Sequence, residues 1–341
     1  FSAVVGWFSQ DLALDLGTSN TRLFFPEHSQ PSIAPTVVAI QSSDAGQRSL
    51  IAVGEEAQLM LGRTPQDIEA VQPVRHGKIN DFEVTEALIV HLLRQAHGRN
   101  RWMSPRMVVT LPPETNEMER HAIRKCCESA GAREVHLIPA PIAAALGAGL
   151  PVEEPAGQMI IDIGGGSTTI SVVSLNRVVH STHVPGGGEG MDRHIISYIQ
   201  KKHGLLIGTA TAESVKQCLG AAAPEAMPKE MVVKGRCMKT GLPKGLTITS
   251  DEVHAALLPA LQTIAKAMLQ ALEASPTELA SDIVDHGVIM VGGGSQLRGL
   301  DACLRLATSL SVFVAEAPEL TSVIGAKKVM ESTELIQSTC V

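Results

Sequence analysis

Alternating apolar and polar positions predict two similar pairs of strands in this chain. Over residues 11–25, apolar side chains at every second position flank the polar stretch Gly-Thr-Ser-Asn, which indicates two strands joined by a turn. Residues 159–175 repeat the design around Gly-Gly-Gly-Ser-Thr-Thr. In each pair an aspartate, Asp15 or Asp162, stands near the end of the first apolar strand, just before the glycine-bearing turn. The recurrence predicts two related halves.

The rest of the chain alternates short apolar strands with segments of helical periodicity. Between the two pairs we expect a strand over 107–111 and helices over 116–131 and 141–149, the latter built from small residues that allow a close approach to a neighbouring backbone. This alternation places the chain in the α/β class. Later we expect helices over 191–202, 211–219 and 251–273, two strands within 232–249 around Thr240-Gly241-Leu242-Pro243, and a strand over 288–291.

Composition limits the size and the chemistry of the protein. At 341 residues the chain has the length of about two domains of roughly 150 residues each. It holds Phe 6, Trp 2 and Tyr 1, so Val, Ile, Leu and Ala must fill the core. The proline-rich span 151–155 is the expected boundary between halves. A net charge of −7 argues against a protein that coats nucleic acid with its whole surface.

The cysteines and the apolar runs argue against further classes of protein. No cysteine lies in a Cys-x-x-Cys pair or at metal-ligand spacing from a histidine, so we expect reduced thiols rather than a zinc site or a disulfide framework. No apolar run is long enough to predict a membrane-spanning helix, and residues 1–8 lack the basic region and cleavage site of a secretory signal. The cysteines are Cys126, Cys127, Cys218, Cys237, Cys303 and Cys340.

Three glycine-bearing turns at strand ends indicate a nucleotide held from two sides. They lie at residues 17–20, 164–167 and 292–294. A backbone without Cβ atoms approaches phosphate oxygens closely, and successive N–H groups there form an anion cradle. Asp15 and Asp162, facing each other across a cleft, would hold Mg²⁺ largely through water. Taken singly, each turn is more often a plain turn, and each aspartate then a turn-capping residue.

These motifs resemble, in the same order, those of the MreB family of bacterial actin homologues. Asp15-Leu16-Gly17-Thr18-Ser19-Asn20-Thr21 resembles the first phosphate loop of the actin and DnaK-type chaperone superfamily, and the segment 162–168 resembles the second. The resemblance covers nearly the whole chain, from Asp11 to Lys328. The narrower resemblance to MreB rests on segments at 53–57, 61–65, 119–124, 130–135, 147–155, 204–208, 211–213, 240–243 and 292–300.

The resemblance implies an α/β, actin-like ATPase fold with two RNase H-like lobes, a nucleotide cleft between them and four subdomains. The corresponding divisions are a membrane-contacting segment 1–10, a first lobe 11–150 with a small subdomain at 35–73, a second lobe 151–320 with a small subdomain at 184–247, and a C-terminal segment 321–341 that returns to the first lobe.

The same resemblance assigns ATP and Mg²⁺ as cofactors and gives individual residues their roles. Asp15 and Asp162 would be the catalytic carboxylates that govern Mg²⁺ and water. From the residues alone, Glu213 and Lys216 are more simply an i, i+3 surface ion pair. The implied nucleotide-binding residues are Gly17, Thr18, Ser19 and Asn20 in the first loop, Gly164, Gly165, Gly166 and Ser167 in the second, Glu213 and Lys216 beside the adenosine, and Gly292, Gly293 and Gly294 near the base and α-phosphate.

The sequence departs from the family pattern at the catalytic carboxylate. Where the family usually reads Ile-Glu-Glu-Pro, residues 138–141 read Ile-Pro-Ala-Pro, and Ala140 takes the place of the glutamate that positions the attacking water. Because losing such a group costs on the order of 10²- to 10⁴-fold in rate, we expect slow or absent hydrolysis, unless another carboxylate such as Glu114 substitutes. Further departures are Gly188-Glu189-Gly190-Met191-Asp192, Thr169 and Cys218.

Two apolar segments predict contact with a membrane. In the first, apolar side chains fall on one side of a short helix, although a tail packed on its own domain is the alternative. In the second, two apolar residues lie in a loop that also carries arginines at 94, 99, 101 and 106; these would each add roughly 1 kcal/mol of attraction to anionic lipid, unless the loop is merely solvated. The resemblance implies that both segments enter the bilayer. The residues concerned are Phe1, Val4, Trp7, Phe8, Trp102 and Met103.

The expected function is that of an ATP-binding, actin-like cytoskeletal protein in the cytoplasm. The resemblance implies filaments on the inner face of the cytoplasmic membrane that organise cell-wall synthesis and rod shape, with at most a slow ATPase activity. The implied partners are the protein itself, the membrane, and the cell-wall elongation proteins RodZ, MreC and MreD, with no nucleic acid. A small-molecule kinase and a chaperone-type ATPase of the same superfamily are the alternatives.

Overall fold

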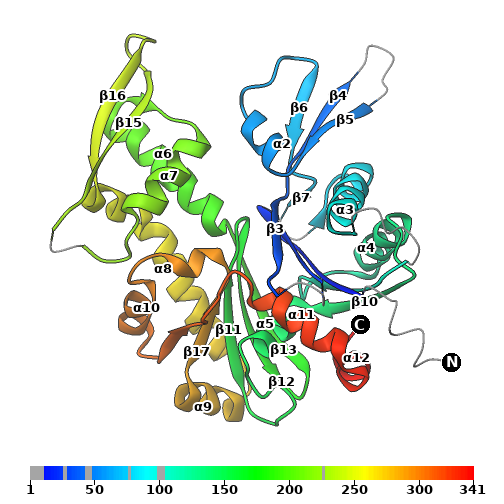
Figure 1. Cartoon of the computed structure of the whole chain (residues 1–341). Coiled ribbons are helices and arrows are strands. Elements are labelled where there is room, and N and C mark those ends of the chain that lie inside the picture. Colours follow the sequence, from blue (N-terminus) through cyan, green and yellow to red (C-terminus); the bar gives the residue numbers. More distant parts are fainter. Residues whose placement is uncertain (1–10, 26–28, 43–47, 76–77, 98–103, 225–226) are drawn as a thin grey trace. The chain divides into compact units, whose positions relative to one another are not determined.

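The computed structural model describes residues 11–25, 29–42, 48–75, 78–97, 104–224 and 227–341 (Figure 1). These residues form two compact units. The described residues of Phe1–Pro155, Ser174–Val178 and Leu320–Val341 make up the first unit, and those of Ala156–Val173 and Val179–Glu319 make up the second. Each unit is therefore assembled from separate stretches of the chain.

A five-stranded sheet forms the centre of the first unit (Figure 1). Its strands are β1 (Leu12–Leu16), β2 (Asn20–Phe24), β3 (Ser32–Pro35), β9 (Arg106–Leu111) and β10 (Glu134–Pro139). They lie in the order β10-β9-β1-β2-β3. β1 pairs antiparallel with β2 and parallel with β9, which pairs parallel with β10. The carboxyl ends of β1, β9 and β10 therefore meet at one edge of the sheet.

Helices cover this sheet and a smaller sheet extends the unit. One buried cluster joins Leu14 of the sheet to Leu88 and Ile123 on two of the helices. A reciprocal pair of hydrogen bonds between Asn116 and Glu119 forms a capping box, which fixes where the second of these helices begins. The helices are α2 (Glu55–Met60), α3 (Phe82–His97), α4 (Glu117–Ser129), α5 (Ala140–Gly147), α11 (Thr321–Glu331) and α12 (Thr333–Thr339), and the remaining strands are β4 (Val38–Ser42), β5 (Arg48–Val53), β6 (Ile68–Val71), β7 (Val74–Arg75) and β8 (Lys78–Ile79).

The small-residue helix α5 lies against the backbone of α11, as its sequence predicts. A Cβ atom on Gly147 would collide with the carbonyl group of Thr321, and one on Gly325 would collide with the carbonyl group of Ala143. α11 also contacts β1 and β9, so this helix from near the end of the chain belongs to the core of the first unit. This crossing is possible only because glycine occupies both positions.

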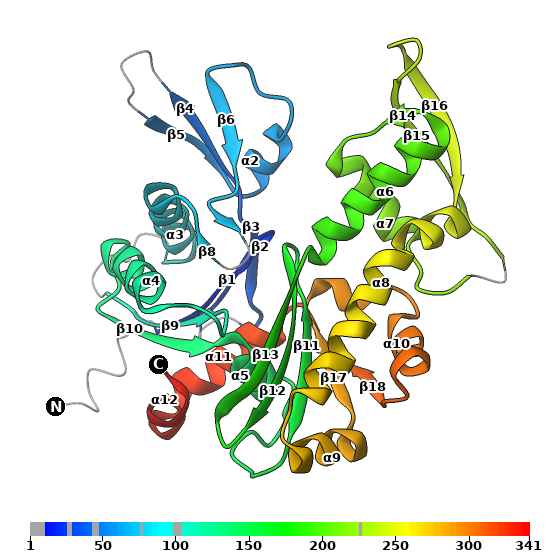
Figure 2. The same ribbon diagram turned by 180° about the vertical axis from the view of Figure 1, so that it is seen from behind.

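The second unit is built on a sheet of the same kind (Figure 2). Its strands are β11 (Gln158–Ile163), β12 (Ser167–Ser174), β13 (Arg177–Pro185), β17 (Val288–Val291) and β18 (Val312–Val314), in the order β13-β12-β11-β17-β18. β11 pairs antiparallel with β12 and parallel with β17, as β1 does with β2 and β9. The other elements are α6 (Gly187–His203), β14 (Leu205–Leu206), α7 (Thr209–Leu219), β15 (Glu230–Cys237), β16 (Pro243–Thr249), α8 (Ser250–Glu273), α9 (Thr277–His286), a 3₁₀ turn η1 (Gly293–Gln296) and α10 (Leu300–Thr308).

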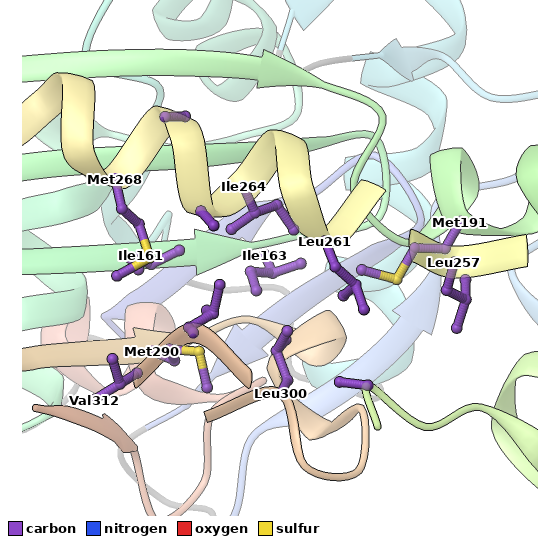
Figure 3. Packing of buried hydrophobic residues seen from close by; sticks show 14 of the residues in the cluster. Ile161, Ile163, Met191, Leu257, Leu261, Ile264, Met268, Met290, Leu300 and Val312 are labelled. Carbon is purple, nitrogen blue, oxygen red and sulfur yellow. The ribbon is translucent and has the colours of Figure 1, made fainter. Parts of the chain in front are cut away.

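The core of the second unit is aliphatic and sulfur-containing, as the shortage of aromatic residues requires. Figure 3 shows Ile161 and Ile163 of β11 packed against Leu261 and Met268 of α8, with Met290 of β17 on the other side of the cluster. α8 is the one described helix that is long and apolar enough to cross a membrane. Its buried face lies in this core, which is the usual position of such a helix in a globular unit.

The predicted strands and helices are present, with some boundaries shifted. The largest shift is at α6, which begins at Gly187 rather than at Met191. Gly186 adopts a left-handed φ of 119° and allows the chain to turn into the helix at that point. Glycine is unfavourable within a helix, so periodicity alone places the start too late.

Candidate functional site

Asp15 lies near the end of β1 with a charged and a polar side chain as its strand neighbours. It is paired in register with Arg22 on β2 and with Thr110 on β9. Nη1 of Arg22 lies 3.3 Å from Oδ2 of Asp15, and the Thr110 hydroxyl donates a 2.5 Å hydrogen bond to Oδ1. The Arg22 and Asp15 side chains are only 13% and 17% exposed. Both carboxylate oxygens of Asp15 therefore have partners within the first unit.

The turn after Asp15 is held by side chains from the neighbouring strands. The Thr36 hydroxyl donates to the Gly17 carbonyl at 2.8 Å and lies 2.8 Å from the Thr21 hydroxyl. The Thr36 N–H donates to the Ser19 carbonyl. A Cβ on Gly17 would lie 2.5 Å from the Asn20 carbonyl oxygen, so only glycine fits there. The predicted residues Gly17, Thr18, Ser19 and Asn20 thus form one tight turn between β1 and β2.

The turn after Asp162 is held by backbone instead. N–H groups of Gly186, Gly188 and Glu189, at the start of α6, donate to the carbonyls of Gly166, Gly164 and Gly165 respectively. The C=O and N–H of one trans peptide point in opposite directions. The N–H groups of residues 165–167 therefore point away from α6. Such a row of N–H groups on one side of a glycine loop is a cradle for an anion.

The third glycine turn packs against the second. A Cβ on Gly292 would collide with Oδ1 of Asp162, and one on Gly294 would collide with the side chain of Ile163. A Cβ on Gly293 would meet no atom within 4 Å among the described residues. The structure therefore brings together the predicted residues at 162–167 and 292–294, at the carboxyl ends of the parallel pair β11 and β17.

Lys216 is an internal residue, so the alternative of an i, i+3 pair with Glu213 is wrong. Its ammonium donates to the Gly188 carbonyl and to Oδ2 of Asp192, each at 2.9 Å. The Asp192 and Lys216 side chains are 10% and 17% exposed, whereas Glu213 is exposed. Because Gly188 lies at the start of α6, Lys216 holds the segment that supports the second loop.

Asp192 is a buried carboxylate that the predicted set of site residues leaves out. Burial raises its pKa above the ordinary value, although the charge and hydrogen bond of Lys216 oppose the shift. Its second oxygen, Oδ1, has no hydrogen-bond partner among the described residues. The one signal in the sequence is the family-like segment 188–192, which ends at this aspartate.

The surroundings of Asp15 are compatible with a hydrated Mg²⁺ ion. This ion keeps several water ligands and takes few protein ligands. A carboxylate offers about four lone-pair sites, so Asp15 still accepts from a metal-bound water after its bonds to Arg22 and Thr110.

Ala140 lies at the same edge of the first sheet as Asp15. β10 ends at Pro139, and Ala140 is the first residue of α5. β9 ends at Leu111 and is followed by the loop that carries the exposed Glu114. A methyl group at this edge neither accepts a proton nor orients a water molecule, and it stands in a half-buried position.

The residues predicted to enter a membrane lie outside the described part of the chain. They are Phe1, Val4, Trp7, Phe8, Trp102 and Met103, and Arg99 and Arg101 lie there too. Arg106 is described, and the structure overturns its predicted role as a lipid-facing charge. Its guanidinium lies 2.7 Å from Oδ2 of Asp11 and donates to the Met330 carbonyl, so this partly buried side chain is bound to other segments of the first unit. Arg94 is exposed on α3.

Comparisons with known proteins agree on one family. The family model described as MreB/Mbl protein matches residues 9–338. The cell shape-determining protein MreB of Escherichia coli K12 is 45% identical over 333 residues, which is 97% of this chain and 96% of the relative. The cell shape-determining protein Mbl of Bacillus subtilis is 38% identical over 327 residues, 96% of this chain and 97% of the relative.

Solved structures confirm the predicted actin-like fold class. The crystal structure of MreB 5 of Spiroplasma citri bound to AMPPNP matches with a TM-score of 0.88 at 31% identity, over 96% of this chain and 97% of that one. The same protein bound to ADP matches with a TM-score of 0.89. The MamK double helical filament matches with a TM-score of 0.77 over 95% of this chain and 99% of that one, but at 18% identity it shares only the fold.

Proposed function

This chain belongs to the MreB/Mbl family, and on that premise we propose that it binds ATP with Mg²⁺ through its phosphate loops and polymerises in the bound state. It is a bacterial actin-like cytoskeletal protein. We take its two units to be the two lobes of the protomer, with subdomains as expected from the sequence. Bound nucleotide would favour the protomer conformation that assembles.

One observation carries the nucleotide site: the same hairpin, with the same aspartate before the same kind of turn, occurs in both units. Asp15 and Asp162 each occupy the position next to the last residue of a strand that has an antiparallel and a parallel neighbour. The MreB 5 structures are bound to AMPPNP and to ADP, which supports a nucleotide as the ligand. Glu213, Lys216 and residues 292–294 would lie toward the adenosine side.

We expect hydrolysis of the bound ATP to be slow because of Ala140. A positioned acid or base contributes on the order of 10²- to 10⁴-fold to rate, and a methyl group supplies none of it. The phosphate loops do not depend on this position, so binding and polymerisation would survive. Filaments would then keep ATP longer than those of relatives with a glutamate there.

The test measures phosphate release and sedimentation of filaments on the same samples with Mg-ATP. The wild-type protein should sediment while releasing little phosphate. The Ala140→Glu variant should release phosphate at least about tenfold faster, because it regains a carboxylate at the edge of the sheet. Ala140→Gln is the matched control, since it adds the same bulk without a charge or a base.

Three results would change the proposal. Failure of the wild-type protein to bind or sediment with Mg-ATP would refute the nucleotide-dependent filament. If the wild-type protein released phosphate rapidly and Glu114→Gln abolished that release, Glu114 would be the residue that positions the attacking water. Equal rates in the Ala140→Glu and Ala140→Gln variants would show that position 140 does not control hydrolysis.

We propose that the filament forms on the inner face of the cytoplasmic membrane. The support is the sequence of residues 1–8 and 99–106 together with the family resemblance. Arg106 does not count among the lipid-facing charges, because it is paired with Asp11. The double variant Trp7→Ala/Trp102→Ala should lose most co-sedimentation with anionic liposomes. Met118→Ala is the control, because it removes an apolar side chain outside the two segments; Met118 is 83% exposed. Unchanged liposome binding by the double variant would refute membrane insertion at these residues.

The proposed role is the organisation of cell-wall synthesis and rod shape, with RodZ, MreC and MreD as partners. The relatives named for determining cell shape support this role. A small-molecule kinase or chaperone-type ATPase is not favoured, because the family match spans almost the whole chain. Sedimentation with Mg-ATP and the absence of sugar phosphorylation would separate the filament from the kinase.

A further inference from the structure

We propose that Arg22 is a positioning residue that neutralises the charge of Asp15 beside the first phosphate loop, and so weakens the dependence of ATP binding on Mg²⁺. The affinity of this protein for ATP would then depend only weakly on the metal. The inference rests on the proposed nucleotide site and adds a determinant of its metal dependence.

The guanidinium of Arg22 lies directly against the first phosphate loop. Its Nη1 is 3.3 Å from Oδ2 of Asp15 and 3.4 Å from the carbonyl oxygen of Asn20. The same nitrogen would lie 3.4 Å from a Cβ placed on Gly17. Arg22, with its side chain 13% exposed, therefore contacts Asn20 at the end of the loop and lies beside Gly17 at its start.

Burial makes this ion pair important to the charge of the site. Two opposite charges a few ångströms apart interact more strongly where water is largely excluded. Without metal, an unpaired Asp15 carboxylate would repel the phosphates, and Arg22 cancels that repulsion. With metal, an unpaired Asp15 would attract the hydrated ion, and Arg22 weakens that attraction. Both effects reduce the difference between ATP affinity with and without Mg²⁺.

The second hairpin shows what the same position looks like without the arginine. In register, Asp162 lies opposite Thr169, as Asp15 lies opposite Arg22. The strand neighbour on the other side of Asp162 is Val291. In the first hairpin, the residue opposite the aspartate is an arginine that balances its charge. In the second hairpin, the residue opposite the aspartate is neutral.

The experiment measures the dissociation constant of a fluorescent ATP analogue in excess Mg²⁺ and in EDTA. For the wild-type protein we expect a loss of affinity of less than about tenfold on removal of the metal. In Arg22→Leu the ratio of the two constants should rise by about tenfold or more, because Asp15 regains an uncompensated charge. Arg22→Lys keeps a positive charge and should stay near the wild-type ratio.

Arg106→Leu is the matched control. It removes the arginine of another partly buried pair on the same sheet, with Asp11 at the opposite end of β1. It should lower the melting temperature without changing the metal dependence of ATP binding. A merely structural role for Arg22 would make the two leucine variants behave alike.

The outcomes separate this inference from the proposed function. Failure of the wild-type protein to bind the analogue even with Mg²⁺ would overturn both. Binding by wild type with equal metal dependence in Arg22→Leu would overturn only the role of Arg22. Should Arg22→Leu fail to fold, the wild-type protein decides: a loss of affinity of about a thousandfold in EDTA overturns the inference, and a loss below about tenfold supports it.

Discussion

The two phosphate-loop hairpins share one topology but are held in different ways. In the first hairpin, side chains hold the loop: Arg22 and Thr110 bind Asp15, and Thr36 binds the turn that follows it. In the second, N–H groups of α6 hold three successive carbonyls of a glycine loop. Two halves of one fold have thus reached the same loop shape through different chemistry.

The difference determines which substitutions each hairpin tolerates. In a loop held by side chains, each substitution of one of those side chains removes one hydrogen bond or one ion pair. The backbone of such a loop contains few glycines. At Gly187, where the backbone of α6 holds the second loop, an added Cβ would meet three loop carbonyl oxygens, so a single methyl group there displaces several contacts at once. We therefore expect larger effects from small changes in the second hairpin than in the first.

The largest effect should come from Gly187→Ala. The added Cβ would collide with the Gly164 carbonyl oxygen and lie 2.7–2.8 Å from those of Ser167 and Gly165. We expect a loss of about 2–4 kcal/mol in the free energy of unfolding and of at least about 100-fold in ATP affinity. Thermal unfolding and nucleotide titration measure the two quantities.

Gly190→Ala on the same helix is the control for that variant. Its added Cβ would meet only the tip of the flexible Arg193 side chain, at 3.7 Å. Alanine is favoured over glycine within a helix by up to about 1 kcal/mol, so stability should hold or rise. Wild-type ATP affinity in Gly187→Ala would show that the second loop does not depend on its contact with α6.

Lys216→Met should have the next largest effect, and the effect should depend on pH. Removal of the ammonium leaves Asp192 buried without its partner, which costs about 2–4 kcal/mol at about pH 8. Burial already raises the pKa of Asp192 above its value in the unfolded chain. Between the unfolded-state pKa and the higher native-state pKa, the native state therefore binds more protons, and the free energy of unfolding falls as pH rises. Without Lys216 the pKa rises further.

The variant should therefore approach wild-type stability on acidification, toward about pH 5. Urea unfolding at several pH values measures this. The double variant Lys216→Met/Asp192→Asn should recover most of the loss near neutral pH, because it removes the buried charge. A deficit that is the same at all pH values would show that Lys216 acts through packing alone.

Thr110→Val should have the smallest effect of the three. It removes the hydroxyl that donates to Asp15 and keeps the shape of the side chain, at a cost of about 1 kcal/mol in stability. The counterpart in the second hairpin is Thr169→Val, opposite Asp162, for which we expect a change within about 0.5 kcal/mol. A larger loss in Thr169→Val than in Thr110→Val would reverse the comparison.

Local patterns predict much of this fold because the features concerned are local. Alternation places both hairpins and their turns, and the capping residues around Asn116 place the start of α4. The small residues of α5 predict a tight helix crossing, although not that its partner is α11. The nucleotide loops are predictable because each strand, turn and strand lies within a few consecutive residues.

The contacts that sequence reasoning misses join residues far apart in the chain. Lys216 finds Asp192 on another helix, while the local rule for helical neighbours favours Glu213. Arg106 on β9 pairs with Asp11, which directly precedes the neighbouring strand β1, rather than facing solvent. The contact of Arg22 is local, unlike those of Lys216 and Arg106, because the register of the predicted hairpin already places Arg22 opposite Asp15. The opposite charges of the two residues were the signal for an ion pair.

The crossing of α5 and α11 has a consequence for how the protein is made. Residues up to 155 leave the ribosome first, yet the first unit lacks α11 until residues 320–341 emerge. At about 5–20 residues per second, the interval is roughly ten to thirty seconds. During translation the second unit can complete its core while the first waits with the surface beneath α11 uncovered. A helix synthesised near the end of the chain thus closes the domain that was begun first.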